Sequence, residues 1–111
     1  MEIGDAAARL EAVSRTYSER FGVERTDDWL VLKLGEEVGE LTQAYLKLSG
    51  QARRKGRTAD EVREAFALEL ADVFAHVVLL ANRHGVDLDD ALEAKWLHAA
   101  DDWDGRPEGL A

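Results

Sequence analysis

The sequence lacks cysteine and long apolar runs, and it has a single proline. Without cysteine there is no disulfide framework, no thiolate nucleophile and no cysteine-bound zinc, so any metal must be bound by oxygen or imidazole ligands. The apolar runs extend over only a few residues, and the first residues lack the basic and then apolar pattern of a secretory signal. We therefore expect neither a membrane-spanning nor an exported protein, and a cytoplasmic protein is the default.

Basic residues are also scarce. The chain has 14 Lys and Arg against 23 Asp and Glu, which gives a net charge of −9. This charge would repel a nucleic-acid backbone or an anionic membrane surface, so we expect neither as a partner. The 111 residues suit one domain, and a hydrophobic content of 46% is enough for a single core. We expect one domain over residues 1–111, with residues 104–111 as a frayed tail.

No segment shows the strict alternation of a β-strand, and apolar residues recur three and four positions apart. This spacing predicts an all-α protein with helices over residues 5–20, 27–48, 58–84 and from residue 87 onward. Thr26 or Asp27, the Thr58 and Glu61 capping box, and Asp87 are the expected helix starts. Two apolar stripes are expected to face the interior: Ile3, Ala6, Leu10, Val13 and Tyr17 in the first helix, and Leu88, Ala91 or Leu92, Lys95, Ala99 and Trp103 in the last. The basic segment between the second and third helices, Arg53, Arg54, Lys55 and Arg57, is interpreted as a solvated loop.

Two acidic patterns interrupt the apolar faces of the second and third helices. The first is Glu36-Glu37-Val38-Gly39-Glu40, and the second is Glu69-Leu70-Ala71-Asp72. Residues three or four apart share a helical face, so like charges are neighbours in each pattern. Glu37 falls within the stripe of the second helix, Glu69 lies between apolar residues of the third, and Asp72 also leans toward the interior.

Several carboxylates crowded in a partly apolar setting predict a cation site. An isolated ionised carboxylate is costly to remove from water, and neighbouring carboxylates raise one another's pKa unless a cation compensates. Two antiparallel helices can face the two acidic patterns toward each other. Oxygen ligands favour Mg²⁺ or Mn²⁺. A di-iron site would require a histidine three residues after a glutamate, and no glutamate in this sequence has one.

The same residues carry a family resemblance. The chain resembles the MazG-like members of the all-α nucleoside triphosphate pyrophosphohydrolases, whose signature is Glu-Glu-x-x-Glu followed downstream by Glu-x-x-Asp. The resemblance covers residues 27–97 and includes the segment Gly85-Val86-Asp87-Leu88. It implies a four-helix bundle and a Mg²⁺-dependent enzyme that cleaves a nucleoside triphosphate to the monophosphate and pyrophosphate.

The resemblance also implies roles for particular residues. Glu37, Glu40, Glu69 and Asp72 would be the metal ligands. Glu36 would orient or deprotonate the attacking water, or help to bind a further metal ion. Pockets lined by both subunits of a homodimer or a dimer of dimers are implied as well.

Two more residues are candidates for substrate binding. Lys95 occupies the apolar stripe of the last helix and would contact a phosphate, with a surface lysine as the alternative. Trp29 would stack on a base, with a packing role as the alternative. Related proteins continue after this lysine with a further basic residue, an asparagine and an arginine, whereas this chain has His98, Ala99 and Asp102.

We therefore predict a metal-dependent nucleotide pyrophosphohydrolase that acts on nucleoside triphosphates. A phosphoribosyl-ATP pyrophosphatase is the alternative within enzymes, because it shares the helical plan. A non-catalytic helical interaction module that retains a metal site for folding is the alternative outside them. The base, the sugar, the number of metal ions and the choice between dimer and tetramer are open at this point.

Overall fold

The structure is a computed structural model that describes residues 2–98, and all described secondary structure is helical. The absence of strands from these residues confirms the all-α prediction. The expected interior positions Ala99 and Trp103 and the expected frayed tail, residues 104–111, lie outside the described residues. The elements are α1 (Ile3–Phe21), α2 (Asp27–Leu48), α3 (Ala59–Arg83), α4 (Leu88–Leu92) and a π-helical turn, η1 (Glu93–Leu97), that continues α4.

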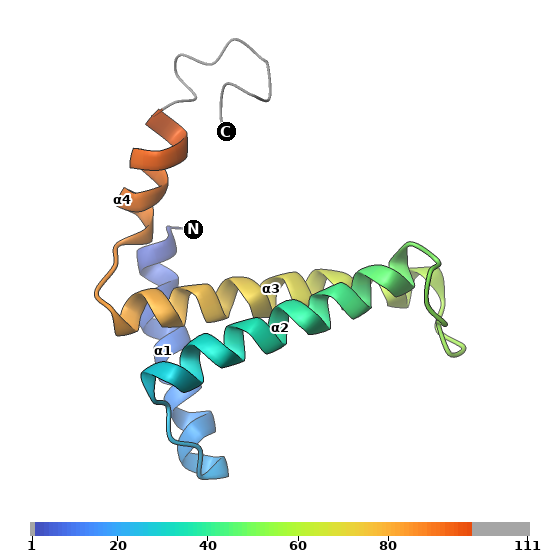
Figure 1. Cartoon of the computed structure of the whole chain (residues 1–111), viewed down its shortest axis with the longest axis horizontal. Coiled ribbons are helices and arrows are strands. Elements are labelled where there is room, and N and C mark those ends of the chain that lie inside the picture. The colour runs from blue at the N-terminus through green and yellow to red at the C-terminus, as the bar shows by residue number, and fades with distance from the viewer. Residues whose placement is uncertain (1, 99–111) are drawn as a thin grey trace.

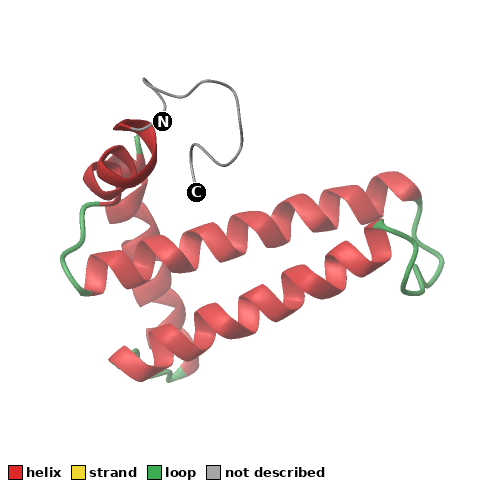
Figure 2. Ribbon diagram, turned by 45° about the horizontal axis from the view of Figure 1, so that its top comes forward, coloured by secondary structure: helices red, strands yellow, loops and turns green. Residues whose placement is uncertain are grey.

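The long helices α2 and α3 form an antiparallel hairpin joined by the loop of residues 49–58 (Figures 1 and 2). Helix α1 crosses this hairpin near the start of α2 and the end of α3, and α4 lies beside the N-terminal end of α1. The Asn82 side chain of α3 donates a hydrogen bond to the Ala7 carbonyl at 3.1 Å, and the Gly4 N–H donates to Asp89 Oδ2 at 3.3 Å. Within residues 2–98 no helix has the length and apolar character needed to cross a membrane.

The starts of α2, α3 and α4 are those predicted from the sequence, whereas α1 begins at Ile3, two residues earlier than expected. Thr26 Oγ1 accepts a hydrogen bond from the Trp29 N–H at 3.0 Å, so Thr26 rather than Asp27 is the N-cap of α2. The reciprocal capping box of Thr58 and Glu61 is present at the start of α3. Asp87 accepts from the Asp90 N–H at the start of α4. These caps satisfy backbone donors that have no partner within the helix.

The buried core is small, and parts of the predicted stripes lie outside it. Ala6 of α1 is buried, but Val13 and Tyr17 are 68% and 53% exposed, because the second half of α1 extends beyond the hairpin. The expected interior positions Leu92 and Lys95 are also exposed. The buried apolar residues among those described are Ala6, Leu30, Ala44, Val62, Val78, Leu79 and Ala81.

A partly buried arginine, Arg25, connects the α1–α2 loop to α1. Its guanidinium donates to both carboxylate oxygens of Glu11, at 2.9 and 2.8 Å, and to Ser14 Oγ at 3.1 Å. Arg83 at the end of α3 donates to the Arg25 carbonyl at 2.9 Å. The pKa of Glu11 falls to about 2, chiefly because Arg25 donates hydrogen bonds to its carboxylate; Arg15 contributes to this shift, and desolvation opposes it. This clamp fixes the direction in which α2 leaves α1.

The Glu11–Arg25 pair predicts a defined loss of stability in acid. A carboxyl whose pKa falls on folding stabilises the protein above its unfolded pKa, and the contribution disappears as the pH falls through the folded pKa. We expect Glu11→Gln to lower the free energy of unfolding by about 2 kcal/mol at pH 7. The difference from wild type should shrink between about pH 4.5 and pH 2, the two pKa values of Glu11.

Denaturant unfolding across this pH range measures the difference. Glu19→Gln is the matched control, because Glu19 is an exposed residue of the same helix. A constant difference between wild type and Glu11→Gln from pH 7 to pH 2 would contradict the assignment of the ion pair.

Candidate metal and active site

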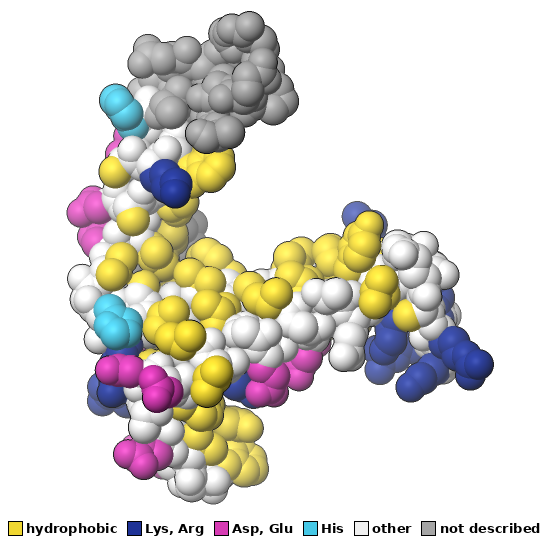
Figure 3. Space-filling model, in the orientation of Figure 1, with side chains coloured by type: hydrophobic (Ala, Val, Ile, Leu, Met, Phe, Trp, Pro, Cys, Tyr) yellow, Lys and Arg dark blue, Asp and Glu magenta, His cyan; other side chains and the backbone are white. Residues whose placement is uncertain are grey.

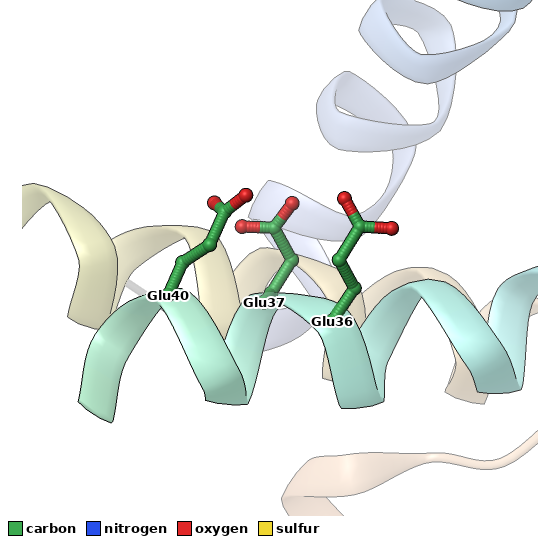
Figure 4. A group of neighbouring side chains, drawn as sticks. All are labelled: Glu36, Glu37 and Glu40. Atoms are coloured by element: carbon green, nitrogen blue, oxygen red, sulfur yellow. The ribbon is translucent and has the colours of Figure 1, made fainter. Parts of the chain in front are cut away.

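The α2–α3 hairpin brings the two acidic patterns together. Carboxylate oxygens of Glu37, Glu69 and Asp72 lie within 4.8 Å of one another, and those of Glu36, Glu37 and Glu40 form a second such group. Figure 4 shows Glu36, Glu37 and Glu40 projecting from the same side of α2. Glu37 belongs to both groups and therefore joins them. We call these five residues the carboxylate cluster.

The side chains of the carboxylate cluster differ in their solvent exposure. Glu37 is only 6% exposed and Glu69 is half-buried, as the sequence predicted. Asp72 is exposed, which corrects the prediction that it leans toward the interior: α1 crosses α3 near its C-terminal end, where Val78 and Leu79 are buried, and Leu68, one turn before Asp72, is 60% exposed. Among the described residues, Glu37 Oε2 and Glu69 Oε2 are buried without a hydrogen-bond partner. Two unpartnered carboxylate oxygens inside one hairpin require an electrostatic explanation.

Mutual repulsion affects the ionisation of the carboxylate cluster. The charge of Glu37 raises the pKa of Glu40, with smaller contributions from desolvation, Glu69 and Glu36. Desolvation raises the pKa of Glu69, followed by the charges of Asp72 and Glu37. Both shifts mean that the folded chain disfavours negative charge at these positions in the absence of a compensating cation.

Lys33 is a residue of this site that the sequence analysis missed. Its ammonium group lies 3.2 Å from Glu36 Oε1 and 3.5 Å from Glu37 Oε1. Desolvation opposes the charged form of Lys33, but the pairing with Glu36 and Glu37 raises its pKa overall. The spacing of three and four residues from Glu36 and Glu37 is a signal that could have identified it. One lysine compensates only part of the charge of five carboxylates.

The carboxylate cluster fits a hard divalent cation. Its ligand atoms are all oxygens, they come from two helices, and two of them are buried without partners. Mg²⁺ and Mn²⁺ prefer this donor set and bind through carboxylates while keeping several waters and substrate phosphates as further ligands. The exposure of Glu40 and Asp72 leaves one side of the cluster open to solvent, where a substrate could approach.

The two predicted substrate contacts differ in their position relative to the carboxylate cluster of the same chain. Trp29 is half-buried in the first turn of α2, about two helical turns before Glu37. Lys95 lies in η1, which continues α4 away from the middle of the hairpin. Trp29 thus lies on the same helix as Glu37, about 12 Å from it along the axis, whereas within one copy of residues 2–98 Lys95 is not brought to the carboxylates.

The helical hairpin with its shared carboxylate cluster has the form expected for an all-α nucleotide pyrophosphohydrolase. The family model described as phosphoribosyl-ATP pyrophosphohydrolase matches residues 8–96, a range that includes the whole cluster. The chain belongs to this family. No curated protein and no solved structure shows a significant match to this chain.

The family match refines the expectation from the sequence. The resemblance to MazG-like proteins holds at the coarser level, because the matched family is itself an all-α nucleoside triphosphate pyrophosphatase-like family. The match favours phosphoribosyl-ATP as the substrate over the general nucleoside triphosphate that the sequence predicts.

Charge repulsion within the carboxylate cluster predicts a stabilising substitution. We expect Glu40→Gln to raise the melting temperature of the protein in EDTA at pH 8, because it removes a charge that the folded state disfavours and leaves the volume nearly unchanged. A thermal melt followed by circular dichroism measures the change. Glu64→Gln on the exposed side of α3 is the control and should have little effect. Equal melting temperatures for wild type and Glu40→Gln would argue against repulsion.

Proposed function

We propose that this protein hydrolyses phosphoribosyl-ATP to phosphoribosyl-AMP and pyrophosphate, with Mg²⁺ or Mn²⁺ bound by Glu37, Glu40, Glu69 and Asp72. The observation that carries the proposal is the match of residues 8–96 to the phosphoribosyl-ATP pyrophosphohydrolase family. The clustering of the four proposed ligands on α2 and α3 supports it, because a polyphosphate needs cationic charge at the place where its anhydride bond breaks.

The proposed chemistry uses one water molecule per substrate. The water oxygen joins one phosphorus of the α–β anhydride, the bond to the bridging oxygen breaks, and pyrophosphate departs. A bound divalent cation would neutralise phosphate charge and stabilise the charge that develops on the leaving group. Glu36 is exposed at the edge of the carboxylate cluster and is the proposed acceptor of the water proton. Lys33, paired with Glu36 at 3.2 Å, would hold that carboxylate in position.

We also propose that the protein works as a homodimer or a dimer of dimers. Val31, Val38 and Tyr45 recur every seven residues along α2, while Leu70 and Phe74 are one turn apart on α3. These five side chains are each about half exposed, and we call them the apolar face. Tyr45 packs on Phe66, one turn before Leu70, which places both parts on the same side of the hairpin.

An exposed apolar face of this kind is typical of an interface. Apolar side chains gather along the α2–α3 hairpin in Figure 3. Symmetric association would cover the apolar face on both copies. A second copy would also give Lys95, which is distant from the carboxylate cluster of its own chain, a route to a substrate phosphate. Its substrate contact is therefore proposed as a contact between subunits.

The substrate assignment can be tested directly with purified protein and Mg²⁺. We expect pyrophosphate release from phosphoribosyl-ATP with a kcat/KM at least about tenfold above that for any standard nucleoside triphosphate, because its additional phosphoribosyl group offers further binding energy. A preference for a standard or modified nucleoside triphosphate would instead support the wider all-α pyrophosphohydrolase activity.

Asp72→Asn tests whether Asp72 is a metal ligand required for that activity. We expect turnover to fall by at least about a hundredfold, because the substitution removes a proposed metal ligand. The helical circular dichroism should persist, since Asp72 is exposed. Asp60→Asn in the first turn of the same helix is the control. Pyrophosphate release by Asp72→Asn at the wild-type rate would refute the assignment of the ligand.

The proposed association predicts that a charge in the apolar face disrupts the oligomer. We expect Phe74→Glu to weaken self-association roughly a hundredfold or more, because a buried unpaired charge is costly. Analytical ultracentrifugation over a concentration series measures this change. Val13→Glu introduces the same charge on α1, outside the apolar face, and should leave the assembly intact. A wild-type protein that is monomeric at all concentrations would contradict the proposal.

A further inference from the structure

A cleft extends from the carboxylate cluster toward the loop between α2 and α3. It has a volume of about 360 Å³. Glu40 and Glu69 line one end, and Lys47 and Arg57 also contribute to its wall, with Gln43 between Glu40 and Lys47 on α2. Glu40 and Lys47 are seven residues apart on α2, which corresponds to two helical turns or about 10 Å along the axis. The cleft therefore has two of the proposed metal ligands, Glu40 and Glu69, and two cations in the same wall.

Lys47 and Arg57 have no ion-pair partner among residues 2–98, although the chain carries a large acidic excess. The C-terminal dipole of α2 would account for a lysine in its last turn. It does not account for Arg57, which directly precedes the N-terminus of α3, where the helix dipole disfavours a cation. Glu61 offers Arg57 only a longer-range attraction.

The loop that carries Arg57 is held at both ends. The Arg54 guanidinium donates to the Lys47 and Leu48 carbonyls at 3.3 and 3.4 Å, and thus caps the end of α2. The Arg57 N–H donates to the Arg54 carbonyl at 3.1 Å, and the capping box of Thr58 follows immediately. These bonds fix the backbone of Arg57 beside the cleft. Arg54 is half-buried, so the sequence-based interpretation of this segment as a solvated loop is wrong for Arg54, whereas Arg53, Lys55 and Arg57 are exposed.

We propose that Lys47 and Arg57 form a phosphate-binding subsite that holds the pyrophosphate half of the substrate. The proposal rests on the proposed pyrophosphohydrolase function. A cleft of about 360 Å³ is at the lower end of the volumes that enclose drug-sized ligands, so it suits two phosphates better than a complete phosphoribosyl nucleotide. Negative charge grows on the departing pyrophosphate, and cations aimed at that group are the ones that favour bond cleavage.

The subsite also stands out against the overall charge of the chain, which has 14 Lys and Arg against 23 Asp and Glu. Figure 3 shows Lys and Arg side chains gathered at the loop end of the hairpin, in an otherwise acidic protein. Lys47 and Arg57 are the members of this basic region that line the cleft.

Inorganic pyrophosphate is the probe that tests the subsite without requiring turnover. We expect isothermal titration calorimetry with Mn²⁺ present to show pyrophosphate binding to the full-length wild-type protein. Lys47→Met and Arg57→Gln should each raise the dissociation constant roughly tenfold to a hundredfold, because each removes a charged hydrogen-bond donor. Arg57→Lys keeps the charge and should restore much of the affinity. Binding of Mn²⁺ alone should be the same in all variants.

Arg53→Gln is the matched control, because it removes the same charge from the same loop at an exposed position that does not line the cleft. The proposal is overturned if wild type does not bind pyrophosphate, or if Lys47→Met and Arg57→Gln bind it as tightly as Arg53→Gln. Loss of affinity in these two variants without any turnover of phosphoribosyl-ATP would support the subsite and refute the proposed function. Turnover of phosphoribosyl-ATP by the wild type, together with unaltered pyrophosphate binding in Lys47→Met and Arg57→Gln, would support the proposed function and refute the subsite.

Discussion

The burial of carboxylates between α2 and α3 is the constraint on which the rest of the structure depends. Glu37 is almost completely buried, and one of its oxygens and one of Glu69 have no hydrogen-bond partner among the described residues. Burying an unpaired carboxylate normally costs several kcal/mol. Lys33 compensates only part of this charge. A hairpin that keeps such groups inside therefore has a lower stability, and it lies within residues 8–96, which match the phosphoribosyl-ATP pyrophosphohydrolase family.

The remaining structure positions this hairpin and leaves much of it uncovered. The Arg25 clamp and the contacts of Asn82 and Arg83 fix α1 and the start of α2 relative to α3. They leave the apolar face of α2 and α3 open, and the proposed substrate contact Lys95 lies away from the carboxylate cluster. The same geometry thus explains why we propose association and why we place part of the substrate site between subunits.

The sequence predicted the features that depend on local spacing. The caps at Thr26 and Thr58 follow from side chains next to the helix ends, and the burial of Glu37 follows from its place in an apolar stripe. Features that depend on tertiary geometry could not be predicted in this way. The Arg25 clamp joins residues 14 positions apart, the exposure of Val13 depends on where α1 crosses the hairpin, and the exposure of Asp72 depends on which part of α3 is covered by α1.

The most direct test of the central claim is a thermal melt across a Mg²⁺ titration at constant ionic strength. A cation that binds only the folded carboxylate cluster should stabilise the wild-type protein by roughly 2.7 kcal/mol at about 100 times its dissociation constant. Glu69→Gln should lose most of this gain, because its half-buried carboxylate supplies part of the site. Equal stabilisation of the two proteins would mean that Mg²⁺ binds the acidic surface at large, and would contradict a defined metal site between α2 and α3.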